Sequence, residues 1–299
     1  MKKLFFLISI AALSQVKAQI DPIKYPTYTN IDEALKSGKT VYSMSLRGKG
    51  MFNLPSEIQQ LDSVFFLNLM ENKFEKMDES IFTLKELTIL NLNENSIKYI
   101  PDEISQLRKL ESFSINLNSL TSINPHVAEL QKLKVIHLDA NNLNIFPEAL
   151  MRIPSLEEIN LQGNQISFIA KDLDKIRNLK SLNLSSNQIN DMENLEFPKS
   201  LKYLELQHNS ISRLPEKLFQ CRNLEFLNVS NNKIGEITPE VKGLKNVVSM
   251  NLANNNLKDL PAGFSKLKNL KTLILTGNPM EKSTVEKLRA LMPQTQIYF

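Results

Sequence analysis

Three side chains in this sequence, His137, Asp139 and Glu158, have types and spacing that suit chemistry. His137 and Asp139 are two residues apart, which places both on one face of a strand. An imidazole and two carboxylates can ligate a metal ion or share a proton. Such a site also needs an enclosed pocket and groups that orient the ligands, and the neighbouring sequence supplies neither. We expect no catalytic residues and no metal site, and a hydrolase using these three residues is the least favoured function.

No other motif in the sequence indicates catalysis. It contains no phosphate-binding glycine loop, no metal-binding spacing of Cys and His, and no nucleophile elbow. The one cysteine, Cys221, is expected as a small buried apolar residue, and it can form no disulfide within the chain. We therefore expect no cofactor and a protein that is not an enzyme.

A repeated set of apolar positions organises the chain. In the stretch 87–107 these positions are taken by Leu87, Leu90, Leu92, Ile97, Ile100, Ile104 and Leu107. The pattern recurs in eleven units, each 23 residues from the next except for one step of 22. A fixed period of this length predicts a solenoid, because one unit cannot bury its own apolar face and must stack on neighbours. The first positions of the units are Val41, Val64, Leu87, Leu110, Leu133, Leu156, Leu179, Leu201, Leu224, Val247 and Leu270.

Each unit predicts two kinds of local structure. Leu90 and Leu92 are two residues apart with polar Asn91 between them, the alternation of a strand. The positions from Ile97 to Leu107 are three or four residues apart, which indicates a helical or 3-10 return. Successive strands should pair as a parallel sheet.

The ninth position of every unit but the first is asparagine. An asparagine at a strand end can bond backbone groups through both its C=O and its NH₂. Ten in register predict a structural ladder that satisfies backbone groups at the same bend of each unit. These residues are Asn72, Asn95, Asn118, Asn141, Asn164, Asn187, Asn209, Asn232, Asn255 and Asn278.

These positions resemble the leucine-rich repeat, L-x-x-L-x-L-x-x-N-x-L, and the continuation in 97–107 resembles its typical 23-residue class. The resemblance covers about residues 41–280. It implies an α/β solenoid: a leucine-rich repeat horseshoe with a parallel β-sheet on the concave face and short helical or 3-10 returns on the convex face. The unit from Leu179 to Ser200 is one residue short, which we interpret as a length variant of the return.

A ligand surface is expected where side chains point away from the core, on the concave face of the sheet. Large apolar and charged side chains interrupt the Asn and Ser columns there, a composition typical of binding hot spots; the alternative is that they only cover the sheet. We expect a protein ligand, because the chain lacks Trp, and glycan or cell-wall binding in adhesion is the alternative. The candidate ligand-binding residues are Phe66, Met70, Ile89, His137, Asp139, Glu158, Tyr203, Glu205, Gln207 and Phe226.

The two ends of the chain differ from the repeats. Residues 1–18 combine early lysines, an apolar run and a small-residue end, which predicts a signal peptide and an exported protein that is secreted, on the cell surface or periplasmic. Residues 19–40 should form an N-terminal helical cap with Asn30 as the helix N-cap. Residues 281–299 should form a helix-plus-strand cap that starts with a capping box at Ser283–Glu286.

Charge and hydropathy limit the partners. Three of the 36 basic residues lie in residues 1–18, so 33 remain against 32 acidic residues. A mature chain near neutrality has no global attraction to nucleic acid, and no nucleic-acid partner is expected. No second apolar segment is long enough to span a membrane after signal removal. The short lysine-containing start and the absence of disulfide caps resemble exported bacterial leucine-rich repeat proteins.

Overall fold

The computed structural model describes residues 24–299, which form two compact units, residues 24–141 and residues 142–299. The predicted signal peptide, residues 1–18, and the start of the predicted N-terminal cap lie outside the described residues. The predicted division into cap, repeats and cap stays a prediction.

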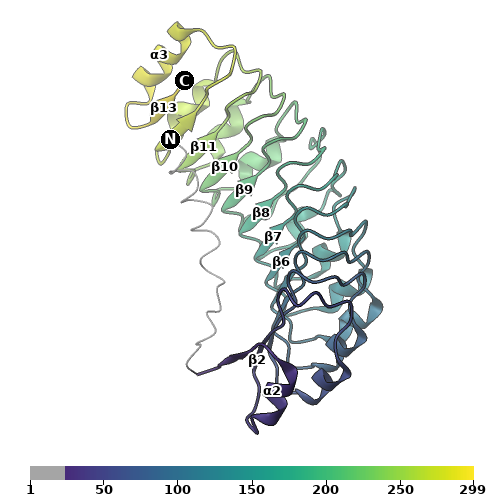
Figure 1. Cartoon of the computed structure of the whole chain (residues 1–299). Coiled ribbons are helices and arrows are strands. Elements are labelled where there is room, and N and C mark those ends of the chain that lie inside the picture. The colour runs from purple at the N-terminus through teal and green to yellow at the C-terminus, as the bar shows by residue number, and fades with distance from the viewer. Residues whose placement is uncertain (1–23) are drawn as a thin grey trace. The chain divides into compact units, whose positions relative to one another are not determined.

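The first unit contains a sheet of parallel strands in sequence order (Figure 1). Each strand pairs with the same positions of the next repeat, so Phe66, Leu67 and Asn68 face Ile89, Leu90 and Asn91. The strands are β1 (Thr27–Tyr28), β2 (Ser43–Ser45), β3 (Phe66–Asn68), β4 (Ile89–Asn91), β5 (Ser112–Ser114) and β6 (Val135–His137).

The second unit repeats this arrangement. Its strands are also parallel and also follow the order of the sequence. They are β7 (Glu158–Asn160), β8 (Ser181–Asn183), β9 (Tyr203–Glu205), β10 (Phe226–Asn228), β11 (Ser249–Asn251), β12 (Thr272–Ile274) and β13 (Gln296–Tyr298).

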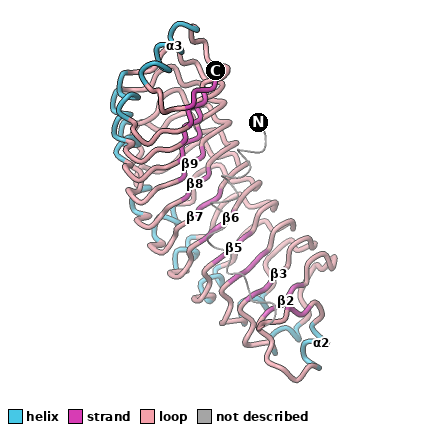
Figure 2. The backbone as a smooth tube through the Cα atoms, turned by 90° about the vertical axis from the view of Figure 1, so that its left-hand side faces the viewer, coloured by secondary structure: helices cyan, strands magenta, loops and turns pink. Residues whose placement is uncertain are grey.

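Most return segments contain a 3-10 helix, and these helices lie opposite the strands in each unit (Figure 2). The predicted alternation of strand and return is therefore confirmed. In the first unit they span Ser56–Gln60, Glu79–Thr83, Asp102–Gln106 and Pro125–Glu129. In the second unit they span Glu148–Arg152, Leu173–Lys175, Glu216–Gln220, Pro239–Gly243 and Ala262–Lys266.

The apolar positions of the repeat form the core. Leu87, Leu90, Leu92, Ile97 and Leu107 are all fully buried, as a stack of amphipathic coils requires. Burying each large side chain contributes about 1.5–3 kcal/mol before the loss of chain entropy is counted.

The short repeat keeps its strand in register. Ser181 of β8 faces Tyr203 of β9 although the two are 22 residues apart, so the missing residue is absorbed entirely in the return. This return has no 3-10 helix within the described residues and instead makes one parallel bridge, Asp172 to Glu196. It leaves a hollow of about 240 Å³ whose walls include Arg177, Phe197 and Cys221.

The asparagine ladder is present in all ten repeats. Asn72 is typical: its Nδ2 donates to the carbonyl oxygens of Leu46 (2.8 Å) and Leu69 (2.9 Å). Its Oδ1 accepts from the backbone N–H groups of Lys49 (3.1 Å) and Met51 (3.0 Å). Each asparagine thus joins its own repeat to the preceding one.

The predicted helix N-cap at Asn30 is confirmed. Helix α2 (Ile31–Lys36) has Asn30 as its N-cap, whose side chain accepts from the backbone N–H of Glu33 at 3.1 Å. The sequence analysis missed β1, which is two residues long and pairs with β2. A strand this short leaves too little alternation to be recognised.

The C-terminal cap differs from the prediction at the start of its helix. Helix α3 (Lys282–Leu291) has Glu281 as its N-cap and no side-chain capping bond, so Ser283 is already inside the helix and the predicted capping box is wrong. Helical spacing places Leu291 on the apolar side with Val285 and Leu288, yet Leu291 is 61 % exposed whereas the other two are buried. The final strand is present as β13, parallel to β12.

Candidate functional site

The strand face is the side of each sheet that points away from the leucine core. Leu67 in β3 is fully buried, while its neighbours Phe66 and Asn68 are half-buried. Since successive strand residues point to opposite sides, the third and fifth positions of each repeat lie on the strand face. The seventh and eighth positions follow directly after each strand and border this face.

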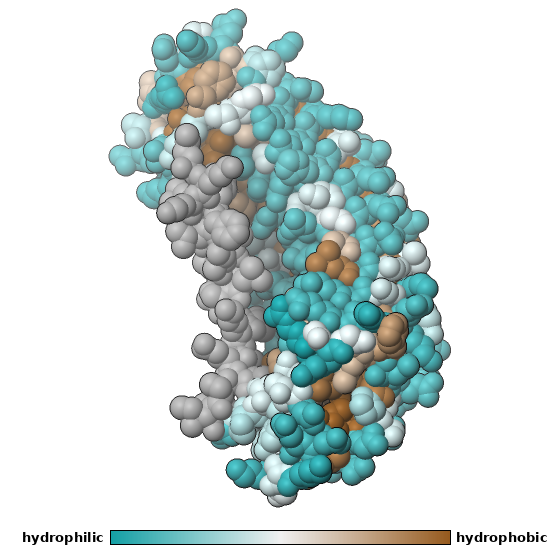
Figure 3. All heavy atoms as spheres, viewed as in Figure 1, coloured by the Kyte–Doolittle hydropathy of each residue, from teal (hydrophilic) through white to brown (hydrophobic). Residues whose placement is uncertain are grey.

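An apolar cluster lies on the strand face of the first unit. Phe66 and Ile89 are register partners on β3 and β4, and both are half-buried. Met70 follows β3, where its backbone N–H donates to Asn68 Oδ1 at 3.0 Å, and it is also half-buried. Figure 3 shows that the surface in that view is mainly hydrophilic, with separate hydrophobic patches. The structure brings Phe66 and Ile89 side by side and places Met70 four residues beyond Phe66.

The eighth positions of three adjacent repeats form a row beside this cluster. Glu71, Glu94 and Leu117 all have left-handed backbones, with φ of 57°, 55° and 54°. The backbone N–H of each donates to the carbonyl oxygen of the next repeat's seventh residue, at 3.0, 2.9 and 2.8 Å. These three residues were not predicted as site residues. Their sequence signal was a bulky or charged side chain directly before the ladder asparagine.

One ion pair lies at the start of this row. Arg47 Nε donates to Glu71 Oε2 at 3.0 Å, and Arg47 Nη2 donates to Glu71 Oε1. The hydrogen bond from Arg47 lowers the pKa of the Glu71 carboxyl. The hydrogen bond to Glu71 raises the pKa of Arg47, and the charges of Glu71 and Glu94 add to this effect. Two carboxylates therefore lie near one guanidinium.

The predicted chemical group is divided between β6 with the residues that follow it and β7. His137 ends β6 and Asp139 follows it, both half-buried in the first unit. Glu158 begins β7 in the second unit and is half-buried. Within residues 24–299, no group of three or more His, Cys, Asp or Glu side chains is arranged to hold a metal ion.

The second predicted cluster lies on the strand face of the second unit. Tyr203 and Glu205 belong to β9, and Gln207 follows that strand; its Nε2 donates to Glu205 Oε2 at 2.9 Å. Phe226 on β10 is the register partner of Tyr203. Tyr203 is half-buried but Phe226 is only 8 % exposed, so Phe226 offers little surface to a ligand.

An imidazole on the return side has a shifted pKa. His126 Nδ1 lies 2.7 Å from Glu129 Oε1, and its Nε2 lies 4.0 Å from Asp102 Oδ2. The hydrogen bond to Glu129 and the negative charges of Asp102 and Glu129 raise the pKa of His126. The side chain of His126 is 47 % exposed, so the group lies open to solvent.

The single thiol is not a reactive group. Cys221 is 1 % exposed, and burial raises its pKa to about 12. A thiol attacks as the thiolate, which is scarce at neutral pH for such a group. The prediction of a small buried residue at this position is confirmed.

Within the described part of the chain, no helix combines the length and apolar character that a bilayer crossing requires. Among residues 24–299 the longest helix is α3, with ten residues.

Several solved structures share this fold. An internalin from Listeria monocytogenes is 22 % identical, with 88 % of this chain and 78 % of the internalin covered and a TM-score of 0.67. The functional domain of InlJ, also from Listeria monocytogenes, is 22 % identical, with 87 % of this chain covered and a TM-score of 0.70. The match spans 53 % of that InlJ chain. Identities this low show the fold alone.

Family models match most of the repeat region. The model "Leucine rich repeat" matches residues 63–118, 108–166, 177–234 and 222–280. A second model, "Leucine Rich repeats (2 copies)", matches residues 154–196. No curated protein matches the chain significantly. The matched ranges extend over most of the chain and coincide with the stacked strands and 3-10 returns, and the protein therefore belongs to the leucine-rich repeat family.

Proposed function

We propose that this protein is an exported, non-enzymatic interaction module that binds a protein ligand through the strand face of its repeats. The observation that carries the proposal is the apolar cluster of Phe66, Met70 and Ile89 on the strand face of the first unit. Membership of the leucine-rich repeat family supports it, because such repeats generally mediate protein binding.

The core does not need these three side chains. Leu67 directly follows Phe66 and Leu90 directly follows Ile89, and both already fill the interior with no exposed surface. Large apolar side chains that remain half-exposed beside polar neighbours are typical of protein-binding surfaces. A rigid sheet also presents them without the entropy cost of ordering a loop.

Export rests on the sequence of residues 1–18, with Lys2 and Lys3 before an apolar run. Mass spectrometry of the mature N-terminus after expression with secretion machinery tests this part separately. Cleavage after Ala18 is expected, and an intact N-terminus would contradict export by this route.

Binding is tested with a phage-displayed library of random peptides selected on the purified, immobilised chain. We expect selected peptides to lose at least tenfold in affinity for the double variant Phe66→Ser, Ile89→Ser. The matched control is Tyr99→Ser, which removes a 54 % exposed aromatic ring elsewhere in the first unit. Equal loss in both variants, or no selected peptide, would contradict the proposal; thermal unfolding checks that each variant is folded.

Glycan binding is the second candidate, and one arrangement in the second unit favours it. Asn254 Nδ2 donates to Asn231 Oδ1 at 2.9 Å, and Asn231 Nδ2 lies 3.5 Å from His208 Nε2. A row of amide and imidazole groups suits sugar hydroxyls. Retention of cell-wall polysaccharide by the chain, lost in Asn231→Ala, would support this candidate over a protein ligand.

A further inference from the structure

The eighth position has a left-handed backbone in every repeat, and Glu71, Glu94 and Leu117 place large side chains there that the fold does not require. Other repeats have glycine or asparagine at this position, residue types that tolerate a left-handed backbone, or Ala140, Ser186 and His208. Glutamate and leucine lack the conformational freedom of glycine, so a left-handed backbone is unfavourable for them. Residues held in a disfavoured conformation are concentrated at binding sites.

Leu117 carries a second cost. Its side chain is 54 % exposed. The burial of this side chain therefore does not offset the free-energy cost of its left-handed backbone. The apolar cluster of Phe66, Met70 and Ile89 begins one residue away, since Met70 directly precedes Glu71. Leu117 therefore adds an exposed apolar side chain to this row, and Glu71 and Glu94 add carboxylates.

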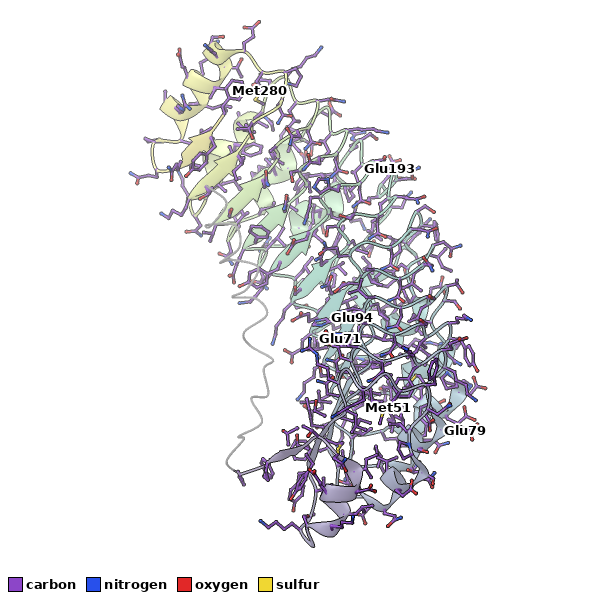
Figure 4. The ribbon with its side chains drawn as sticks, in the orientation of Figure 1. Met51, Glu71, Glu79, Glu94, Glu193 and Met280 are labelled. Carbon is purple, nitrogen blue, oxygen red and sulfur yellow. The ribbon has the colours of Figure 1, made fainter. Side chains whose placement is uncertain are left out.

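The charge of this surface is negative. Arg47 pairs with Glu71, but Glu94 has no ion-pair partner among residues 24–299, although it lies near enough to influence Arg47. Figure 4 shows Glu71 and Glu94 next to each other. An unpaired carboxylate beside exposed apolar groups complements a cation that is flanked by apolar side chains.

We propose that the protein ligand of the first unit is a segment that presents an arginine or lysine to Glu94, with an adjacent apolar side chain packed on Leu117 and Met70. The guanidinium or ammonium group replaces water at the Glu94 carboxylate and competes with Arg47 for Glu71. This inference rests on the proposed function, because it assigns a chemistry to the ligand of the same strand face.

The probe is an array of nine-residue peptides whose central residue is Arg, Lys, Gln or Glu and whose flanking positions vary among Leu, Phe, Ser and Gly. The purified chain should bind peptides with a central Arg or Lys at least tenfold more strongly than those with Glu. Flanking Leu or Phe should strengthen binding, and added salt should weaken it. Arg47→Gln should strengthen binding, because it frees the Glu71 carboxylate.

Reversing the charge of Glu94 tests whether this residue contacts the central residue of the peptide. Glu94→Lys should invert the preference toward a central Glu by at least tenfold. The matched control, Glu79→Lys, makes the same charge change in the first unit but within a 3-10 helix on the return side, as Figure 4 shows, and should leave the preference unchanged.

The variant Leu117→Asn distinguishes a role of Leu117 in ligand binding from a role in stability. Asparagine tolerates the left-handed backbone, so this variant should unfold at a higher temperature while losing affinity for peptides with flanking Leu or Phe. A purely structural role for Leu117 would leave that affinity unchanged.

The outcomes distinguish this inference from the proposed function. Peptide binding that depends on Phe66 and Ile89 but shows no preference for a basic centre, or no inversion in Glu94→Lys, overturns the inference alone. The absence of binding to every peptide overturns both. Tighter binding of anionic peptides by the unchanged chain also overturns the inference.

Discussion

Asn255 Nδ2 donates to the carbonyl oxygen of Val229, 3.0 Å away in the preceding repeat. The same amide donates to Leu252 O at 3.0 Å, and its Oδ1 accepts from the backbone N–H of Ile234 at 3.0 Å. One side chain thus satisfies backbone groups of two repeats in a site where it is only 4 % exposed. The ladder is a joint between repeats as well as a turn residue.

Replacing Asn255 by Ala should therefore destabilise the protein by about 1–3 kcal/mol, since buried donors and acceptors lose their partners. The matched control is Asn256→Ala, because Asn256 is exposed and contributes a hydrogen bond only through its backbone N–H, which remains. Chemical denaturation measures both. Similar midpoints for the two variants would show that the ladder does not hold the repeats together.

Two 3-10 returns approach each other so closely at Gly243 that we expect only glycine to fit there. A Cβ at Gly243 would lie 2.1 Å from the carbonyl oxygen of Phe219, whereas a Cβ at Gly235 would meet nothing within 4 Å. Gly243→Ala should destabilise by about 1–3 kcal/mol, because the 3-10 helices must move apart. Gly235→Ala should be neutral or slightly stabilising. Thermal unfolding of the pair measures the difference, and equal melting temperatures would count against such close packing of the two returns.

The buried thiol predicts a pH dependence. Burial raises the pKa of Cys221 from 9.0 to about 12, so the folded state binds this proton more tightly than the unfolded state. The resulting stabilisation is fully present below pH 9 and is lost as the pH rises toward 12. The stability difference between the protein and Cys221→Ala should be constant below pH 9 and shrink above it.

Denaturation at a series of pH values measures this difference, and titrations common to both proteins cancel. A difference that stays constant to pH 12 would show that the thiol ionises as easily in the folded state as in the unfolded one. As an independent check, an alkylating reagent at pH 8 should modify Cys221 only after unfolding, because the folded thiol is buried and protonated.

The sequence alone determined the repeat architecture. Leucines at fixed spacing, as in 87–107, predict a strand and a return in each unit, and the ladder asparagines predict hydrogen bonds to the backbone at the bend of each unit. Both predictions succeed because they depend on local periodicity and on a side chain bonding its near backbone. The register of β8 and β9 also agrees with the sequence, because the missing residue is assigned to the return and Ser181 does face Tyr203.

Only the tertiary structure decided which side chains remain available to a ligand. The left-handed backbones of Glu71, Glu94 and Leu117 follow from hydrogen bonds to the next repeat, which no single repeat contains. Phe226 and Tyr203 occupy equivalent positions in the sequence pattern but differ in exposure. Apolar periodicity specifies which side chains the core must bury. The exposure of side chains on the opposite face depends on neighbours that stacking brings together. That exposure could therefore be determined only from the folded chain.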